Sequence, residues 1–143
     1  MSVMARVLLL GLAGCSASAN RGGGKLAWVN IEKHSRPEIQ KAVEQVLEKN
    51  GFELVTGGPQ MIFDRKAGSV KTLAYSSLSG KRVYSRVKIT IDNNGVGGHV
   101  VGLNAFVVRD RGDPVFEDEQ KLLTFSKGEY QDMLDDVQHQ LGP

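Results

Sequence analysis

Cysteine is almost absent from this chain of 143 residues, and Cys15 is its single example. One thiol excludes an internal disulfide, so the fold has to rely on its buried core. An excess of one charge sign is also lacking, because 18 lysines and arginines stand against 16 acidic residues, for a formal net charge of +2. A chain so close to neutral has no global field that attracts nucleic acid. We therefore expect no nucleic-acid partner.

Long apolar runs and catalytic signatures are missing as well. The apolar run at residues 7–12 is far below the roughly 20 residues that a membrane-spanning helix needs. No serine lies in a Gly-x-Ser-x-Gly elbow, and His34, His99 and His139 are far apart without metal-ligand spacing. We therefore expect no catalytic residue, no metal and no cofactor.

The first fifteen residues have the layout of a secretory signal. A short start ends in the positive charge of Arg6, an apolar run follows, and small residues precede Cys15. This order of charge, apolar run and small residues is typical of a segment that is removed on export. The order Leu12-Ala13-Gly14-Cys15 in particular resembles the lipobox of bacterial lipoproteins.

The resemblance implies a lipid anchor on Cys15. In bacterial lipoproteins this cysteine receives a thioether-linked diacylglycerol, the signal is removed, and a third acyl chain usually follows. Two or three chains hold a protein firmly to a membrane, since each buried methylene contributes about 0.8 kcal/mol. Ser16, and not an aspartate, follows Cys15. The resemblance therefore implies the cell envelope, and in a Gram-negative host the outer membrane, facing the periplasm.

Three segments make up the predicted organisation. Residues 1–14 are the signal peptide, residues 15–24 are the lipidated cysteine with a flexible tether rich in Ser, Ala and Gly, and residues 25–143 are a single domain. Loss of the signal removes Arg6 and no acid, so the formal charge falls from +2 to +1. A body of this length can bury a core without disulfides.

Two segments have helical periodicity. In 35–50, Ser35 and Glu38 have capping-box spacing, Pro37 lies in the first turn, and Gly51 ends the helix. Ser126 and Glu129 repeat the capping-box spacing at the start of 126–141. The apolar stripes are Ile39, Ala42, Val43, Val46 and Leu47 in the first helix, and Tyr130, Met133, Leu134, Val137 and Leu141 in the second.

The region between the two helices predicts a sheet. The segment 82–92 alternates between apolar and polar residues, and 99–109 follows it after the turn signal Asn93-Asn94-Gly95. Further strands are expected at 52–55 and 60–63, with a short first strand at 25–31, while 70–78 is ambiguous. The predicted fold is α+β and two-layered, an antiparallel sheet of about four strands with the N- and C-terminal helices packed on one face.

The polar side of 82–92 carries the candidate anion- or partner-binding residues Arg82, Tyr84, Arg86 and Lys88. Basic side chains around an aromatic ring resemble sheet surfaces that bind anionic polymers, although a solvated strand face explains the same pattern. The acidic group is interpreted as a solvated loop rather than a calcium site, and consists of Asp110, Asp113, Glu117, Asp118 and Glu119. The glycine-rich segment 93–98 is interpreted as a hairpin tip, since no helix follows it to bind phosphate.

These features predict a small exported bacterial lipoprotein that is not an enzyme. It is expected to be a binding or assembly module at the cell envelope, with the membrane as one partner and an envelope protein as another. Two alternatives stay open: a lipid- or glycan-binding protein that uses the basic strand face, and a small envelope hydrolase in which His99 meets an acid and a nucleophile. The sequence does not indicate the oligomeric state.

Overall fold

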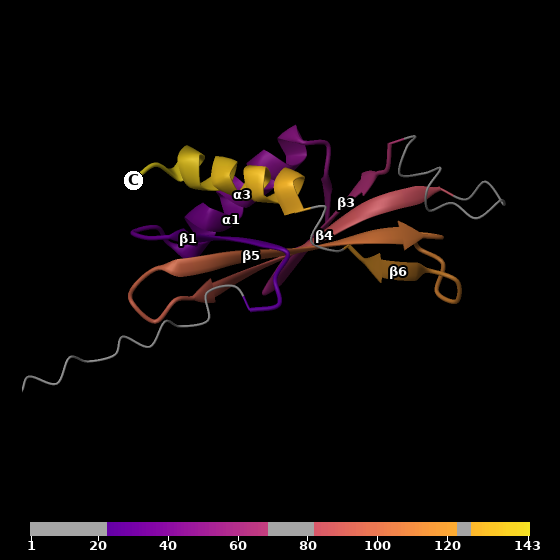
Figure 1. The fold of residues 1–143 in the computed structure, drawn as a ribbon, viewed down its shortest axis with the longest axis horizontal. Coiled ribbons are helices and arrows are strands. Elements are labelled where there is room, and N and C mark those ends of the chain that lie inside the picture. Colours follow the sequence, from indigo (N-terminus) through magenta and orange to yellow (C-terminus); the bar gives the residue numbers. More distant parts are fainter. Residues whose placement is uncertain (1–22, 69–81, 123–126) are drawn as a thin grey trace, which may run out of the picture.

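The computed structural model describes residues 23–68, 82–122 and 127–143 (Figure 1). The elements in chain order are β1 (Ala27–Ile31), α1 (Arg36–Lys49), β2 (Glu53–Thr56), β3 (Gln60–Lys66), β4 (Val83–Asn93), β5 (His99–Arg109), β6 (Asp118–Lys121) and α3 (Lys127–Leu141). The ambiguous segment 70–78 and the predicted helix cap at Ser126 lie outside the described residues.

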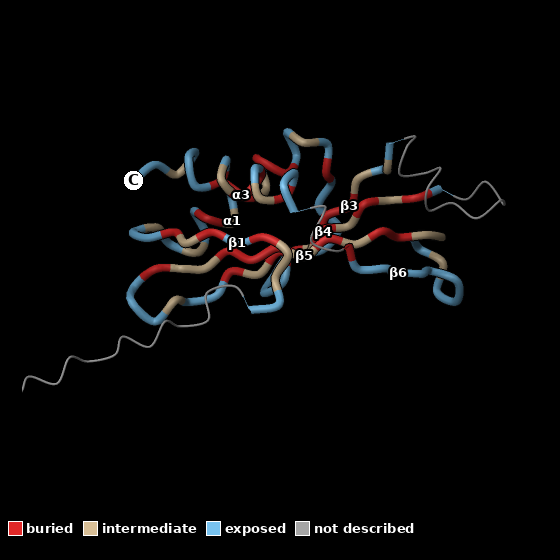
Figure 2. Tube along the Cα trace, in the orientation of Figure 1, coloured by how far each residue is buried: buried red, intermediate tan, exposed pale blue. Residues whose placement is uncertain are grey.

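All the described strands belong to one antiparallel sheet, which confirms the α+β class. The strand order is β1-β5-β4-β3-β2, and β6 pairs with the second half of β5. The expectation of about four strands is wrong, because the described residues form a sheet of six. The sequence of β6 is Asp-Glu-Gln-Lys, which has no apolar alternation to reveal a strand. Its backbone pairs with residues 106–109 of β5 while its side chains are largely exposed (Figure 2).

The hairpin of β4 and β5 forms the centre of the sheet. Its register runs without a break from Val83 opposite Arg109 to Asn93 opposite His99. The turn is closed by side-chain oxygens, since Asn93 Oδ1 accepts the Gly95 N–H at 2.7 Å. Gly95 has a φ of +79°, a left-handed conformation that glycine adopts without strain. The predicted central hairpin and its turn are therefore confirmed.

Helix α1 begins and ends at the predicted signals. The Glu38 carboxylate accepts the N–H and the hydroxyl of Ser35, both at 2.7 Å, and these hydrogen bonds lower the pKa of Glu38. At the other end, Gly51 has a φ of +82°, and the Phe52 N–H donates to the Leu47 carbonyl at 3.0 Å. This is the hydrogen bond of a Schellman motif, and it brings Phe52 into the core.

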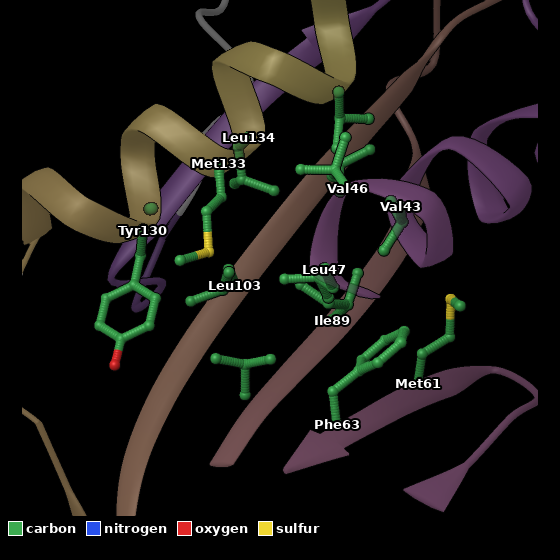
Figure 3. Packing of buried hydrophobic residues seen from close by; sticks show 14 of the residues in the cluster. Val43, Val46, Leu47, Met61, Phe63, Ile89, Leu103, Tyr130, Met133 and Leu134 are labelled. Atoms are coloured by element: carbon green, nitrogen blue, oxygen red, sulfur yellow. The ribbon is translucent and has the colours of Figure 1, made fainter. Parts of the chain in front are cut away.

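One side of the sheet carries the hydrophobic core. Alternate residues of the central strands, such as Ile89 of β4 and Leu103 of β5, are buried in one cluster with the apolar stripes of both helices, of which Leu141 is only partly buried. Figure 3 shows Leu47 of α1 next to Ile89, and Met133 of α3 near Leu103. Full burial of such a side chain stabilises by roughly 1.5–3 kcal/mol, so this side, the core face, is the main source of stability.

The opposite side of the sheet, here called the open face, receives the N-terminal segment. A Cβ added to Gly102 would lie 3.0 Å from Lys25 Cγ, so the Lys25 stem crosses the sheet at this glycine. Lys121 Nζ at the end of β6 donates to the Gly24 carbonyl at 3.3 Å. In Figure 1 this entry point lies across the sheet from the helices. The chain therefore enters the domain over the open face, beside β6.

The outer edge of β1 is closed by two glutamines of α3. Gln131 accepts the Trp28 N–H at 3.3 Å and donates to the Trp28 carbonyl at 3.0 Å, and Gln138 donates to the Asn30 carbonyl at 2.7 Å. These backbone groups point away from β5 and are free to pair with another strand unless they are covered. Covering an edge in this way prevents association with a second chain.

Candidate functional site

The predicted binding residues lie where the alternation of β4 places them. Tyr84, Arg86 and Lys88 alternate with buried core residues and point to the open face, and Arg82 lies exposed just before the strand. The structure therefore brings together the residues that the sequence predicted to share a face. It also gives two of them, Arg86 and Lys88, ion-pair partners that the sequence did not reveal.

Arg86 forms a two-pronged ion pair with Asp64, its register partner on β3. Arg86 Nε lies 2.8 Å from Asp64 Oδ1, and Nη2 lies 2.9 Å from Oδ2. The Asp64 side chain is 1% exposed and that of Arg86 is 12% exposed. A buried carboxylate needs a charged partner, and paired hydrogen bonds from a guanidinium are the strongest kind available. Arg86 is therefore first of all the structural partner of Asp64.

Two more carboxylates reach the same guanidinium. Arg86 Nη1 lies 2.7 Å from Glu117 Oε1 and 3.1 Å from Glu119 Oε2, and Lys88 Nζ lies 2.5 Å from Glu119 Oε1. The hydrogen bonds to Asp64 are the largest cause of a raised pKa at Arg86. The Gly112 N–H, which donates to Glu117 at 2.7 Å, and then Arg86 lower the pKa of Glu117.

Two aromatic residues of the open face, Tyr84 and Phe106, lie under cations as well. The Arg111 guanidinium lies 4.7 Å from the centre of the Tyr84 ring, and Arg111 Nε lies 2.7 Å from Asp64 Oδ2. Lys88 Nζ lies 4.5 Å from the centre of the Phe106 ring. Both distances are within the range of cation–π attraction. The face of Tyr84 that could stack on a ligand is therefore already in contact with Arg111.

These residues form the open-face network, in which three cations meet three carboxylates. Its members are Arg86, Lys88, Arg111, Asp64, Glu117 and Glu119. From the sequence, the basic strand and the acidic segment are predicted as two unrelated features. The structure instead places Glu117 and Glu119 against the basic strand. An incoming anion has to displace these carboxylates, so the network does not favour anion binding at Arg86 or Lys88. That role stays a prediction.

The described residues do not assemble the other chemistries considered above. Within the described ranges, no three His, Cys, Asp or Glu side chains gather to hold a metal ion. The Nδ1 atom of His99 and the Nε2 atom of His34 are buried, and neither has a hydrogen-bond partner in the part of the chain that is described. Neither atom therefore has the bonded acid or nucleophile that the hydrolase alternative requires.

Two grooves flank the C-terminal end of α3. The larger has a volume of about 600 Å³, and its polar lining residues are Asn30, Glu32, Lys33, Gln138 and His139. The smaller, of about 340 Å³, lies between α1 and α3, and its polar lining residues are His34, Glu38, Lys41, Gln45 and Gln140. Each lining contains both acidic and basic side chains. The charge of the lining therefore does not favour a ligand of either sign.

Comparison with known proteins gives no relative for this chain. No family model matches the sequence, and neither a curated protein nor a solved structure matches it. Both helices in the described part of the chain are too short and too polar to cross a membrane. Cys15, the predicted lipidation site, lies outside the described residues.

Proposed function

We propose that the protein is an exported lipoprotein, held at a membrane by acyl chains on Cys15 and acting there as a binding or assembly module. The order Leu12-Ala13-Gly14-Cys15 behind the apolar run 7–12 carries this proposal. Small residues before a cysteine supply the cleavage signal, and the Ser- and Gly-rich segment 16–24 supplies a tether. The membrane in question is that of the cell envelope, and in a Gram-negative host the outer membrane, facing the periplasm.

The place where the chain enters the domain supports a module displayed from a membrane. Gly24 and Lys25 lie over the open face, so the tether leaves the domain on this face, which we propose lies toward the bilayer. With the two-layer packing that we propose, both helices lie on the far face of the sheet and point away from the membrane. The two grooves beside α3 are then available to an envelope protein partner.

The state of the carboxylates supports a role other than catalysis. General acid–base catalysis works best with a group whose pKa lies near the working pH. Glu117 has its pKa lowered away from neutrality, and Asp64 is engaged by both Arg86 and Arg111. In the open-face network these acids are structural groups, and we assign them no reaction.

The test is the intact mass of the mature protein expressed in a Gram-negative host. The native chain is expected to lack residues 1–14, to carry added diacylglycerol and acyl mass, and to sediment with membranes. Cys15→Ser is expected to lose the acyl mass and the processing, while Ser16→Ala, a matched change at the next residue, keeps both. A native chain that retains Met1 and shows no acyl mass contradicts the proposal.

A further inference from the structure

The loop between β5 and β6 presents two large apolar side chains to solvent. Val115 is 78% exposed and Phe116 is 65% exposed, and they are neighbours in sequence. Among the described residues, the only other large apolar side chain above half exposure is Val96, at the tip of the β4–β5 hairpin. It is costly to expose two neighbouring apolar side chains to water at a loop tip. Such exposure commonly marks an interaction site.

This loop is held in one shape by its own hydrogen bonds. Asp113 Oδ1 accepts the Val115 N–H at 2.9 Å and the Phe116 N–H at 3.0 Å. The next residue, Glu117, accepts the Gly112 N–H and is ion-paired with Arg86. The open-face network therefore anchors the base of the loop, so the tip loses little conformational entropy when it binds.

The loop lies on the same face of the sheet as the entry of the N-terminal segment. Glu117 contacts Arg86 and Arg111 contacts Tyr84, and both strand residues point to the open face. Lys121, at the other end of β6, contacts Gly24. One short strand, β6, therefore connects the point of entry to the loop tip.

We propose that Val115 and Phe116 are a second membrane contact, entering the headgroup region of the bilayer that holds the acyl chains of Cys15. This inference rests on the proposed lipoprotein function. From Lys121 back to Phe116 the chain covers at most about 17 Å at roughly 3.4 Å per residue. A flexible chain of the length that separates Cys15 from Gly23 has an r.m.s. span of about 16 Å. The two lengths match, so the anchor and the loop tip can reach one surface together.

The charge around the loop selects the kind of lipid. Residues 109–119 contain five carboxylates and two arginines, a formal charge of −3, and Arg86 and Lys88 offset two of these charges through their ion pairs with Glu117 and Glu119. The remaining charge is still negative and gives the loop no attraction to anionic headgroups, so the surface that fits is zwitterionic. An envelope protein with an apolar pocket is the competing occupant, and the experiment separates the two.

The experiment places an environment-sensitive fluorophore on the acylated full chain. Because Cys15 is consumed by lipid, Val115→Cys introduces the one free thiol, and Val96→Cys is the matched control, since Val96 is 75% exposed at another turn. Both proteins are reconstituted in vesicles of phosphatidylcholine and phosphatidylethanolamine. The label at 115 is expected to brighten several-fold and to be quenched by brominated lipid, and the label at 96 is expected to do neither. Replacing part of the lipid with phosphatidylglycerol is expected to lower the signal at 115.

The other outcomes overturn the proposal in distinguishable ways. If the chain carries its acyl mass and the 115 label stays dim, the loop proposal fails and the lipoprotein proposal stands. If no acyl mass is found, both proposals fail. Brightening in native membranes but not in pure lipid assigns the loop to a protein partner, and equal brightening at 96 and 115 shows that the domain has no preferred contact.

Discussion

Arg86 and Asp64 face each other in register on β4 and β3 and are joined by two hydrogen bonds, of 2.8 and 2.9 Å. The same guanidinium holds Glu117, and the same carboxylate holds Arg111, so residues from the β5–β6 loop close over the pair. This relationship connects the centre of the sheet with the loop that presents Val115 and Phe116. The open face is therefore held together by charge, as the core face is by apolar burial.

Replacing Arg86 with methionine is expected to lower the free energy of unfolding by about 3 kcal/mol, because it leaves Asp64 buried with an incomplete set of partners. Urea unfolding followed by the fluorescence of Trp28, the one tryptophan, measures this change. Arg82→Met makes the same chemical change at an exposed residue just before the strand, and a shift within about 0.5 kcal/mol is expected. Equal losses of unfolding free energy in the two variants would show that burial of the Arg86–Asp64 pair does not determine its contribution to stability.

The lowered pKa of Glu117 predicts a dependence of stability on pH. A carboxylate whose pKa is lower in the folded state stabilises the fold above its ordinary value of 4.5, and this contribution is lost as the pH falls through the folded-state value. Glu117→Gln is expected to lower stability at pH 7 and to flatten the decline in acid. Urea midpoints at pH 7 and in the acid range test this.

The matched control for the pH experiment is Glu53→Gln, at an exposed position on β2. It is expected to leave both the stability at pH 7 and the acid decline close to those of the native chain. If Glu117→Gln has the same acid decline as the native protein, the hydrogen bond from Gly112 and the ion pair with Arg86 do not stabilise the charged form.

The parts of the fold that could be predicted are those encoded locally. The Ser35–Glu38 spacing and Gly51 mark the two ends of α1, and Asn93-Asn94-Gly95 marks the central turn, because each signal acts through neighbouring backbone groups. Strand β6 has no such signal. Its backbone pairing to β5 is what makes it a strand, and its polar side chains are the same as those of a loop.

The candidate site could be predicted only on one strand. Alternation placed Tyr84, Arg86 and Lys88 on a shared face, and this needed nothing beyond residues 82–92. The partners of Arg86 come from elsewhere, Asp64 lying 22 residues away and Glu119 lying 33 residues away in sequence. Which charges meet depends on the registers of β3 with β4 and of β5 with β6, and single-strand patterns carry no information on register.

Gly51 is expected to tolerate alanine poorly. Its φ of +82° lies in the left-handed region, so a Cβ adds about 1 kcal/mol of strain even though the nearest atom, Arg65 Cδ, is 3.5 Å away. Gly57 is the matched control, because it lacks a positive φ and has nothing within 4 Å of an added Cβ. Thermal unfolding should show a lower midpoint for Gly51→Ala and an unchanged or slightly higher one for Gly57→Ala. Equal midpoints would contradict the capping role of Gly51.

The closed edge of β1 gives the last prediction. Gln131 and Gln138 hold the outward backbone groups of Trp28 and Asn30, so the double change to alanine removes the three hydrogen bonds between α3 and β1 and opens the edge. Each bond contributes about 1 kcal/mol net, and partial hydration of an exposed edge reduces the total to about 2 kcal/mol. An open edge can pair with a second chain. The double variant is therefore expected to unfold at lower urea concentration and to associate as its concentration rises in sedimentation velocity.

Gln140→Ala provides the control for this edge, because Gln140 lies on the same helix and bonds to the side chain of Gln45 rather than to β1. Its unfolding in urea and its sedimentation are expected to match those of the native chain. Association without a loss of stability would mean that the glutamines act only by blocking a second strand, whereas a loss of stability without association would mean that they act only as hydrogen-bond donors and acceptors. The structure assigns them both effects, since the same atoms satisfy the edge and occupy the place of a neighbouring strand. A double variant that behaves as the native chain in both experiments would contradict that assignment.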